Sequence, residues 1–243
     1  MRRVGIDEIA THKGHKSYAV IITDLDEARP IAVLPERKKA ALKAYWETWS
    51  KELRQQIEEV SMDLWKDYRD VAEVMFPNAA IVADRFHVMK QLQQELDELR
   101  KKEQKKHPKE LKHSKYALLK NEAELNEKQK VKLIEVQEVS PQLKLAHRLK
   151  ESFRELMNQA RSVEEGRERL AGWCKEARAS GLFTQTLETF GRWLEPILNY
   201  FRKGTSNGVV EGINNKVKVI KRLAYGFRNF GNFRLRVLAA WWS

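Results

Sequence analysis

Four acidic residues interrupt stretches of the sequence that are otherwise apolar or basic. Two of them, Asp63 and Asp84, end apolar segments, Asp7 lies within one, and Glu211 adjoins a basic region. An ionised carboxylate near a core costs free energy unless a cation or a metal ion balances it. A salt bridge is the ordinary explanation for any one such acid, whereas three that converge require divalent cations between them.

Asp7, Asp63 and Glu211 are the three acids that neighbouring strands and a helix packed on them could bring together. Ligation by carboxylate oxygens alone suits Mg²⁺ or Mn²⁺. Two such ions about 4 Å apart support in-line phosphoryl transfer, because one activates the attacking hydroxyl and the other stabilises the leaving oxygen. This triad is therefore our candidate for both catalysis and metal binding.

Asp84 and His87 form a second pair, three residues apart at an expected strand-to-helix junction. Either Asp84 caps the helix and a backbone carbonyl satisfies His87, or the pair braces a metal site or a phosphate. The other histidines lack the spacing of metal ligands, and the lone Cys174 supports neither a zinc site nor a disulfide. A reducing, cytoplasmic location is expected.

The charge of the chain is strongly positive and unevenly distributed. The 243 residues carry a net charge of +12, and the last 32, from Gly212 onward, hold seven Lys or Arg and no acid. This balance favours a polyanionic partner, nucleic acid first and a membrane surface second. No apolar run is long enough to predict a membrane span.

Aromatic and amide side chains accompany these cations. The rings of residues 225, 227, 230 and 233 either stack on unpaired bases or pack in a core at helical spacing. A helix is expected over about 208–222, capped by Ser206 or Asn207, and positions 211, 214, 215, 218 and 222 would share a face. The candidate DNA-binding residues are Asn214, Asn215, Lys218, Lys221, Arg222, Arg228 and Arg234.

The elements that must position these residues follow from periodicity. Apolar runs predict strands over 3–9, 17–25, 31–34, 57–63 and 79–83, the first three as an antiparallel meander. Helices are predicted over 38–56 and 65–75. Residues 88–200 lack strand signals and predict four to six helices. We therefore expect an α/β fold with a mixed five-stranded sheet and a large all-helical insertion, divided as 1–90, 91–202 and 203–243.

Three segments carry a resemblance that covers essentially the whole chain. They are GIDEIATHKGHKSYAVIITDL, VSMDLWKDYRDVAEVMFPNAAIVADRFHVMKQL and SNGVVEGINNKVKVIKRLAYGFRNFGNFRLRVL. These segments resemble the ISL-three family of bacterial insertion-sequence transposases. That family is similar to the DDE recombinases, whose catalytic domain has a ribonuclease H-like fold.

The resemblance also implies roles for individual residues. It implies a first catalytic acid at Asp7 on the first strand, a second at Asp63 after the fourth, and Glu211 on a late helix beyond an insertion. Asp84 and His87 fit an acid-x-x-His signature of related transposases. Asp84 is the alternative second acid, and we prefer Asp63 because it ends the fourth strand.

The implied activity is metal-dependent DNA strand cleavage and strand transfer, with Mg²⁺ or Mn²⁺. The implied partners are the DNA of the element's ends and of the target, and other copies of the chain in a synaptic complex near the nucleoid, without a membrane. Family members usually carry an N-terminal zinc module and a helix-turn-helix, which we expect this chain to lack. The alternatives are an inactive DNA-binding remnant and a metal-dependent nuclease without strand transfer.

Overall fold

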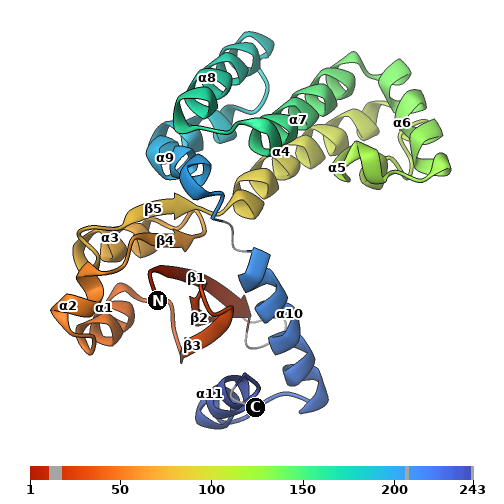
Figure 1. Cartoon of the computed structure of the whole chain (residues 1–243). Helices are drawn as coiled ribbons and strands as arrows, with labels where there is room; N and C mark the ends of the chain where they lie inside the picture. Colours follow the sequence, from red (N-terminus) through yellow and green to blue (C-terminus); the bar gives the residue numbers. More distant parts are fainter. Residues whose placement is uncertain (11–17, 206–207, 242–243) are drawn as a thin grey trace. The chain divides into compact units, whose positions relative to one another are not determined.

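The computed structural model of the chain describes residues 1–10, 18–205 and 208–241. These residues form two compact units. The sheet unit comprises Met1–Asp84 and Glu195–Ser243, and the helical unit comprises Arg85–Leu194. Each unit is described by itself below, and both are drawn in Figure 1. The predicted cap at Ser206 or Asn207 lies outside the described residues.

The sheet unit contains one five-stranded mixed sheet with the order β3-β2-β1-β4-β5. Strands β1, β2 and β3 pair antiparallel as a meander, while β4 and β5 continue the sheet in parallel with β1. This confirms the predicted mixed five-stranded sheet. The strands are β1 Arg3–Ala10, β2 Tyr18–Asp24, β3 Arg29–Leu34, β4 Glu59–Met62 and β5 Ala80–Ala83.

Alternation along the strands divides the apolar residues between the two faces of the sheet. One face, with Ile6 and Met62, packs against α1 Lys39–Glu47 and α3 Lys66–Met75. The other face, with Ile9, Ala19, Ile21 and Val33, packs against α10 Gly208–Leu223 and α11 Phe230–Ala239. The two helices that come last in the chain therefore cover a face built from its first strands.

The prediction of a single helix over 38–56 is wrong, because the structure has two helices in this segment. After α1, the chain turns and a short helix, α2, runs over Lys51–Gln55. The Ser50 hydroxyl accepts a hydrogen bond from the Leu53 amide at 3.2 Å, which caps the new helix. A serine three residues before an apolar position is the sequence signal for this start.

The start of α10 is anchored to the sheet by the chain that precedes it. The hydroxyl of Thr205 donates to the carboxylate of Glu59 on β4, and both side chains are buried. Nearby, the Lys203 ammonium lies 2.6 Å from the carboxylate of Glu58. These two contacts hold Lys203 and Thr205 against Glu58 and Glu59, where β4 begins.

The helical unit contains no strand among its described residues, as predicted. Its elements are α4 Arg85–Lys106, α5 Lys115–Leu119, a 3-10 turn at Glu122–Glu124, α6 Glu127–Val139, α7 Pro141–Gln159, α8 Val163–Ser180 and the first part of α9 Thr184–Lys203. An aromatic cluster joins α7, α8 and α9, with the rings of Phe153 and Phe190 stacked at 5.2 Å. None of the described helices is long and apolar enough to cross a lipid bilayer.

A buried lysine ties two of these helices together. Lys150 on α7 is completely buried, and its ammonium donates to the carbonyls of Leu118 at 2.7 Å and Lys120 at 2.6 Å. The carboxylate of Glu151 balances its charge at 2.5 Å. The last carbonyls of α5, which a helix leaves unpaired, are thereby satisfied by a side chain from α7.

Candidate active site

The parallel register of the sheet aligns three aspartates in one row. Ile6 on β1 pairs with Met62 on β4, and Met62 pairs with Ala83 on β5. Parallel strands lie about 4.8 Å apart, so the residues that follow these three stand side by side at one level of the sheet. Those residues are Asp7, Asp63 and Asp84.

Asp7 is held through both of its carboxylate oxygens. Its Oδ1 accepts a hydrogen bond from the Glu8 amide at 2.7 Å, and its Oδ2 accepts one from Asn214 Nδ2 on α10, also at 2.7 Å. Both Asp7 and Asn214 are buried. The two hydrogen bonds, one to each carboxylate oxygen, fix the orientation of the group.

Asn214 was expected from the sequence to contact DNA, and the structure places its side chain inside, against Asp7. It continues the inward face of α10, where Val210, Ile213 and Val217 are buried. The spacing 210, 213, 214 and 217 is the apolar stripe of a helix, and it could have located Asn214. Asn214 Oδ1 is buried and has no hydrogen-bond partner among the described residues, so an oxygen ligand lies unused beside Asp7.

Tyr68 on α3 links the electrostatics of the two central acids. Its side chain is buried, and its hydroxyl makes no hydrogen bond within the described structure. Burial, together with the carboxylates of Glu8, Asp63 and Asp7, raises the pKa of Tyr68 well above its usual range. The charges of Asp7 and Asp63 therefore act on one hydroxyl. Sequence reasoning missed Tyr68, since an aromatic residue at helical spacing looks like any core residue.

A stacked arginine supports the chain segment just after Asp63. The guanidinium of Arg37 lies over the rings of Tyr18 and Trp65, at 4.7 Å and 4.5 Å from their centroids. It also pairs with the carboxylate of Glu8 at 3.0 Å. Cation–π contacts and an ion pair thus connect the strand that bears Asp7 to the loop that leaves Asp63. The sequence carried no motif for this contact.

Glu211 lies in the first turn of α10, one turn before Asn214, and its side chain is exposed. Asp84 is buried at the end of β5, whereas His87 is half-buried on α4 in the helical unit. The described residues contain no group of three or more His, Cys, Asp or Glu that could hold a metal ion. The convergence of Asp7, Asp63 and Glu211 on one metal therefore stays a prediction.

The donors near Asp7 and Asp63 are chemically suited to a hard cation. Carboxylate oxygens dominate the row, and the unpartnered buried oxygen of Asn214 adds an amide carbonyl. Mg²⁺ and Mn²⁺ prefer such oxygen ligands over nitrogen or sulfur. By donor type, the residues at this edge of the sheet fit the metal that the sequence predicted.

The predicted DNA-binding residues fall into two groups. Lys221 is half-buried, its ammonium donates to the Ala10 carbonyl, and burial lowers its pKa. Lys218 is exposed and donates to Asn215 Oδ1 at 3.2 Å. The others are exposed side chains, Asn215, Arg222, Arg228 and Arg234. Their contacts with DNA stay predictions.

A mixed sheet of this order, with helices on both faces and a large helical insertion, defines a ribonuclease H-like domain. The family model for transposases of the ISL-three type matches residues 4–237, and the chain belongs to that family. This confirms the resemblance drawn from the three sequence segments. No solved structure matches the chain.

Named relatives include transposases of two insertion elements. The chain is 30% identical to the transposase for insertion sequence element IS1001 of Bordetella parapertussis, an alignment covering 98% of the chain and 60% of that protein. It is 29% identical to the transposase for insertion sequence element IS1557 of Mycobacterium tuberculosis, covering 94% of the chain and 57% of that protein. The chain thus spans just over half the length of these relatives.

A shorter similarity involves a protein with a different name. Over 52 residues, or 21% of the chain, the sequence is 50% identical to a Lactococcus lactis protein named ATP-dependent protease. The stretch covers 17% of that protein. So short a segment does not transfer an activity to this chain.

Proposed function

We propose that the chain is the catalytic part of a transposase that cleaves DNA strands and joins the freed ends to target DNA. The observation that carries the proposal is the Asp7 carboxylate, which Glu8 and Asn214 hold from both sides in the same row as Asp63. A buried acid oriented this firmly is typical of a group that must present its oxygens to a ligand. Membership of a transposase family supports the same conclusion.

In this proposal Asp7, Asp63 and Glu211 hold the divalent cation. Bound Mg²⁺ or Mn²⁺ would neutralise the phosphate charge and lower the pKa of the attacking hydroxyl or water. Asn214 and the Glu8 amide keep Asp7 in one rotamer. Exposed cations of α10 and the residues after it, such as Arg222, bind the phosphates on either side of the reacting one.

The reaction has two in-line steps. In the first, a water oxygen forms a bond to phosphorus, the bond from phosphorus to the 3′-oxygen breaks, and that oxygen leaves as a 3′-hydroxyl. In the second, the same 3′-hydroxyl attacks a target phosphodiester and displaces the target's own 3′-oxygen. Positioning and charge neutralisation account for most of the catalysis in such transfers.

The partners follow from this activity. The substrates are the DNA ends of an insertion element and a target duplex, which the chain would meet in the bacterial cytoplasm near the nucleoid. Joining two ends to one target requires two active sites, so we expect copies of the chain to assemble on DNA. The names of the two relatives, each the transposase of an insertion element, support this choice of substrate.

The test is strand cleavage of a duplex that carries one end of the element encoding the chain, with Mg²⁺ or Mn²⁺. D7A, D63A and E211A should each reduce cleavage by at least 100-fold and leave DNA binding largely intact. E27A is the matched control, because Glu27 is an exposed acid in the β2–β3 turn. If D84A abolishes cleavage and D63A does not, Asp84 is the second acid.

The products distinguish the alternatives. Joined products in the presence of a target plasmid support a transposase, whereas cleavage without joining indicates a metal-dependent nuclease. DNA binding without cleavage by the wild-type chain indicates a catalytically silent remnant and contradicts the proposal. Full activity in all three acid variants would also contradict it.

A further inference from the structure

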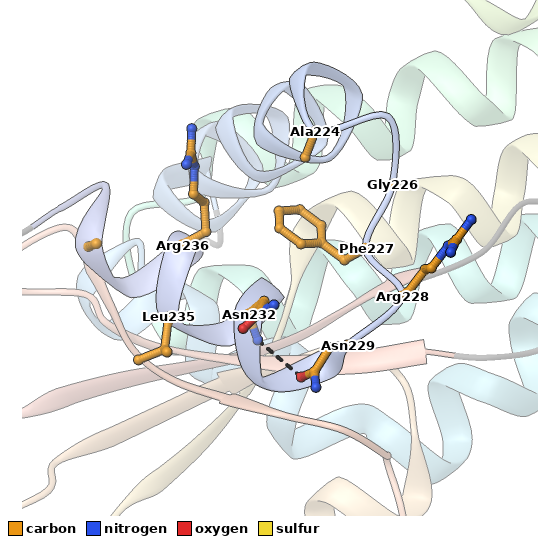
Figure 2. Close-up of a pocket in the computed structure, with 9 residues that line it drawn as sticks. Ala224, Gly226, Phe227, Arg228, Asn229, Asn232, Leu235 and Arg236 are labelled. Atoms are coloured by element: carbon orange, nitrogen blue, oxygen red, sulfur yellow. Dashed lines mark hydrogen bonds between the residues drawn. The ribbon is translucent and has the colours of Figure 1, made fainter.

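The hairpin between α10 and α11 borders an open surface pocket of about 650 Å³, which Figure 2 shows. The lining contains cations, amides and apolar groups but no acid. The residues that line it are Ala224, Gly226, Phe227, Arg228, Asn229, Asn232, Leu235, Arg236 and Ala239. This volume is within the range of pockets that bind small ligands, and it is large enough for one nucleotide.

Of the four rings in this part of the chain, three belong to the core. Phe233 is buried, and Phe227 and Phe230 pack on it with centroids 5.4 Å and 6.0 Å away. All three contribute to the cluster that covers the sheet. Packing thus accounts for these phenylalanines and leaves one aromatic side chain, Tyr225, without a place in the core.

Tyr225 is fully exposed, at 101% of its reference area, and its φ angle is +52°. The left-handed conformation costs a residue other than glycine about 1–2 kcal/mol. Exposure of the ring also forgoes the free energy that its burial would contribute. This left-handed residue ends α10, because the amides of Tyr225 and Gly226 donate to the carbonyls of Arg222 and Lys221 at 3.0 Å, and the cap leaves the tyrosine ring in solvent.

Electrostatics identify the ligand as an anion. Residues 212–243 contain no acid, and Arg228 and Arg236 of the lining form no ion pair with any described residue. Asn229 uses its Oδ1 to accept from the Asn232 amide at 3.3 Å, as Figure 2 shows, which leaves its Nδ2 as a donor. Two guanidinium groups suit phosphates, and amide side chains suit the polar edge of a base.

We propose that this hairpin binds one unstacked nucleotide of the DNA substrate, with its base on the Tyr225 ring and its phosphates on Arg228 and Arg236. Ala224 and Gly226, the residues on either side of Tyr225 in the chain, line the pocket, whereas the exposed ring of Tyr225 lies outside the lining. Bases stack on aromatic side chains whatever their sequence, because every base has a π-face. The inference rests on the proposed function, which supplies DNA as the ligand.

Helix geometry gives the distance along α10 between Glu211 and the hairpin. Twelve residues separate Glu211 from Leu223, the last residue of α10. At about 1.5 Å per residue they span roughly 18 Å, or about five nucleotide steps of 3.4 Å. A DNA strand that runs along α10 would therefore place this nucleotide about five steps from the phosphate at Glu211.

The experiment measures binding in EDTA, so that cleavage plays no part. One probe is a blunt 20-base-pair duplex, and the other carries a six-nucleotide single-stranded extension with 2-aminopurine at one position in turn. The wild-type chain should bind the extended duplex more tightly and quench 2-aminopurine at one position. Y225A should weaken binding to the extended duplex by about 5- to 160-fold, a stacking loss of about 1–3 kcal/mol, with little effect on the blunt one.

Two matched variants sharpen the test. Y116A removes an exposed tyrosine of the helical unit and should change neither probe's affinity. R228Q and R236Q should each lower the slope of log affinity against log salt by roughly 0.7–0.9. Y225W should retain the preference for the extended duplex.

The outcomes separate this inference from the proposed function. If Y225A binds both probes as the wild type does, or loses both equally, the stacking site is wrong even where cleavage is observed. If the 2-aminopurine signal depends on Tyr225 but no DNA is ever cleaved, the binding site stands and the proposed activity fails.

Discussion

The contact between Asn214 and Asp7 makes a quantitative prediction about stability. The two side chains are buried, and Asn214 Nδ2 lies 2.7 Å from Asp7 Oδ2. A hydrogen bond to a charged group contributes about 1.5–3 kcal/mol. N214A should therefore lower the free energy of unfolding by that amount, which corresponds to roughly 3–12 °C in Tm for a chain of this size.

N214D should cost more than N214A, because it replaces a donor with a second carboxylate. Two unit charges 2.7 Å apart repel by about 6 kcal/mol at an effective dielectric constant of 20. A divalent cation between the two carboxylates would reverse this repulsion. Mn²⁺ should therefore raise the Tm of N214D by more than that of N214A or of the wild type.

Asn215 provides the matched control for this measurement. It is the same residue type on the same turn of α10, but it is exposed. N215D adds the same charge and should change stability by less than about 0.5 kcal/mol. Thermal unfolding in EDTA and in Mn²⁺ compares all four proteins. Equal stability of N214D and N215D in EDTA would refute the buried contact, and equal gains in Mn²⁺ would refute a cation site beside Asp7.

Further predictions concern the helical unit. Burial, with the nearby Lys150, lowers the pKa of His147 from 6.5 to about 4, so the unfolded chain takes up this proton first on acidification. The contribution of neutral His147 to the free energy of unfolding is thus fully present above pH 6.5, and it falls by about 3 kcal/mol toward pH 4. Urea unfolding at several pH values should show this loss in the wild type but not in H147L. Parallel curves of unfolding free energy against pH for the two proteins would contradict the prediction. K150A should lower the unfolding free energy by about 2–5 kcal/mol, because it leaves the carbonyls of Leu118 and Lys120 unpaired. K144A, on the exposed side of α7, should cost less than about 0.5 kcal/mol, and equal losses in the two variants would contradict the role of Lys150.

The strands were predictable because buried strands appear in the sequence as short apolar runs. Each of the five predicted runs overlaps an observed strand, and the antiparallel meander follows from its short connections. The row of Asp7, Asp63 and Asp84 was harder to predict from the sequence, since it depends on the parallel register of three strands. Register is a property of packing between segments distant in the sequence, and no local pattern specifies it.

The side chains around Asp7 were mostly unpredictable for a related reason. Asn214 was assigned to DNA because it shares a predicted helix face with Glu211, although its position in the apolar stripe of α10 places it inside. Tyr68 and Arg37 act through contacts with residues far from them in the chain. The phenylalanines of the C-terminal segment and Tyr225 have the same spacing pattern, and only the fold shows which rings it buries.

The hydrogen bond between Asp7 and Asn214 joins residues 207 positions apart. A bacterial ribosome adds about 5–20 residues each second, so Asn214 is made roughly 10–40 s after Asp7. The whole helical unit is synthesised in that interval, before α10 can reach the sheet. In a nascent chain the acid row on the sheet therefore lacks its Asn214 contact until the whole helical unit has been made.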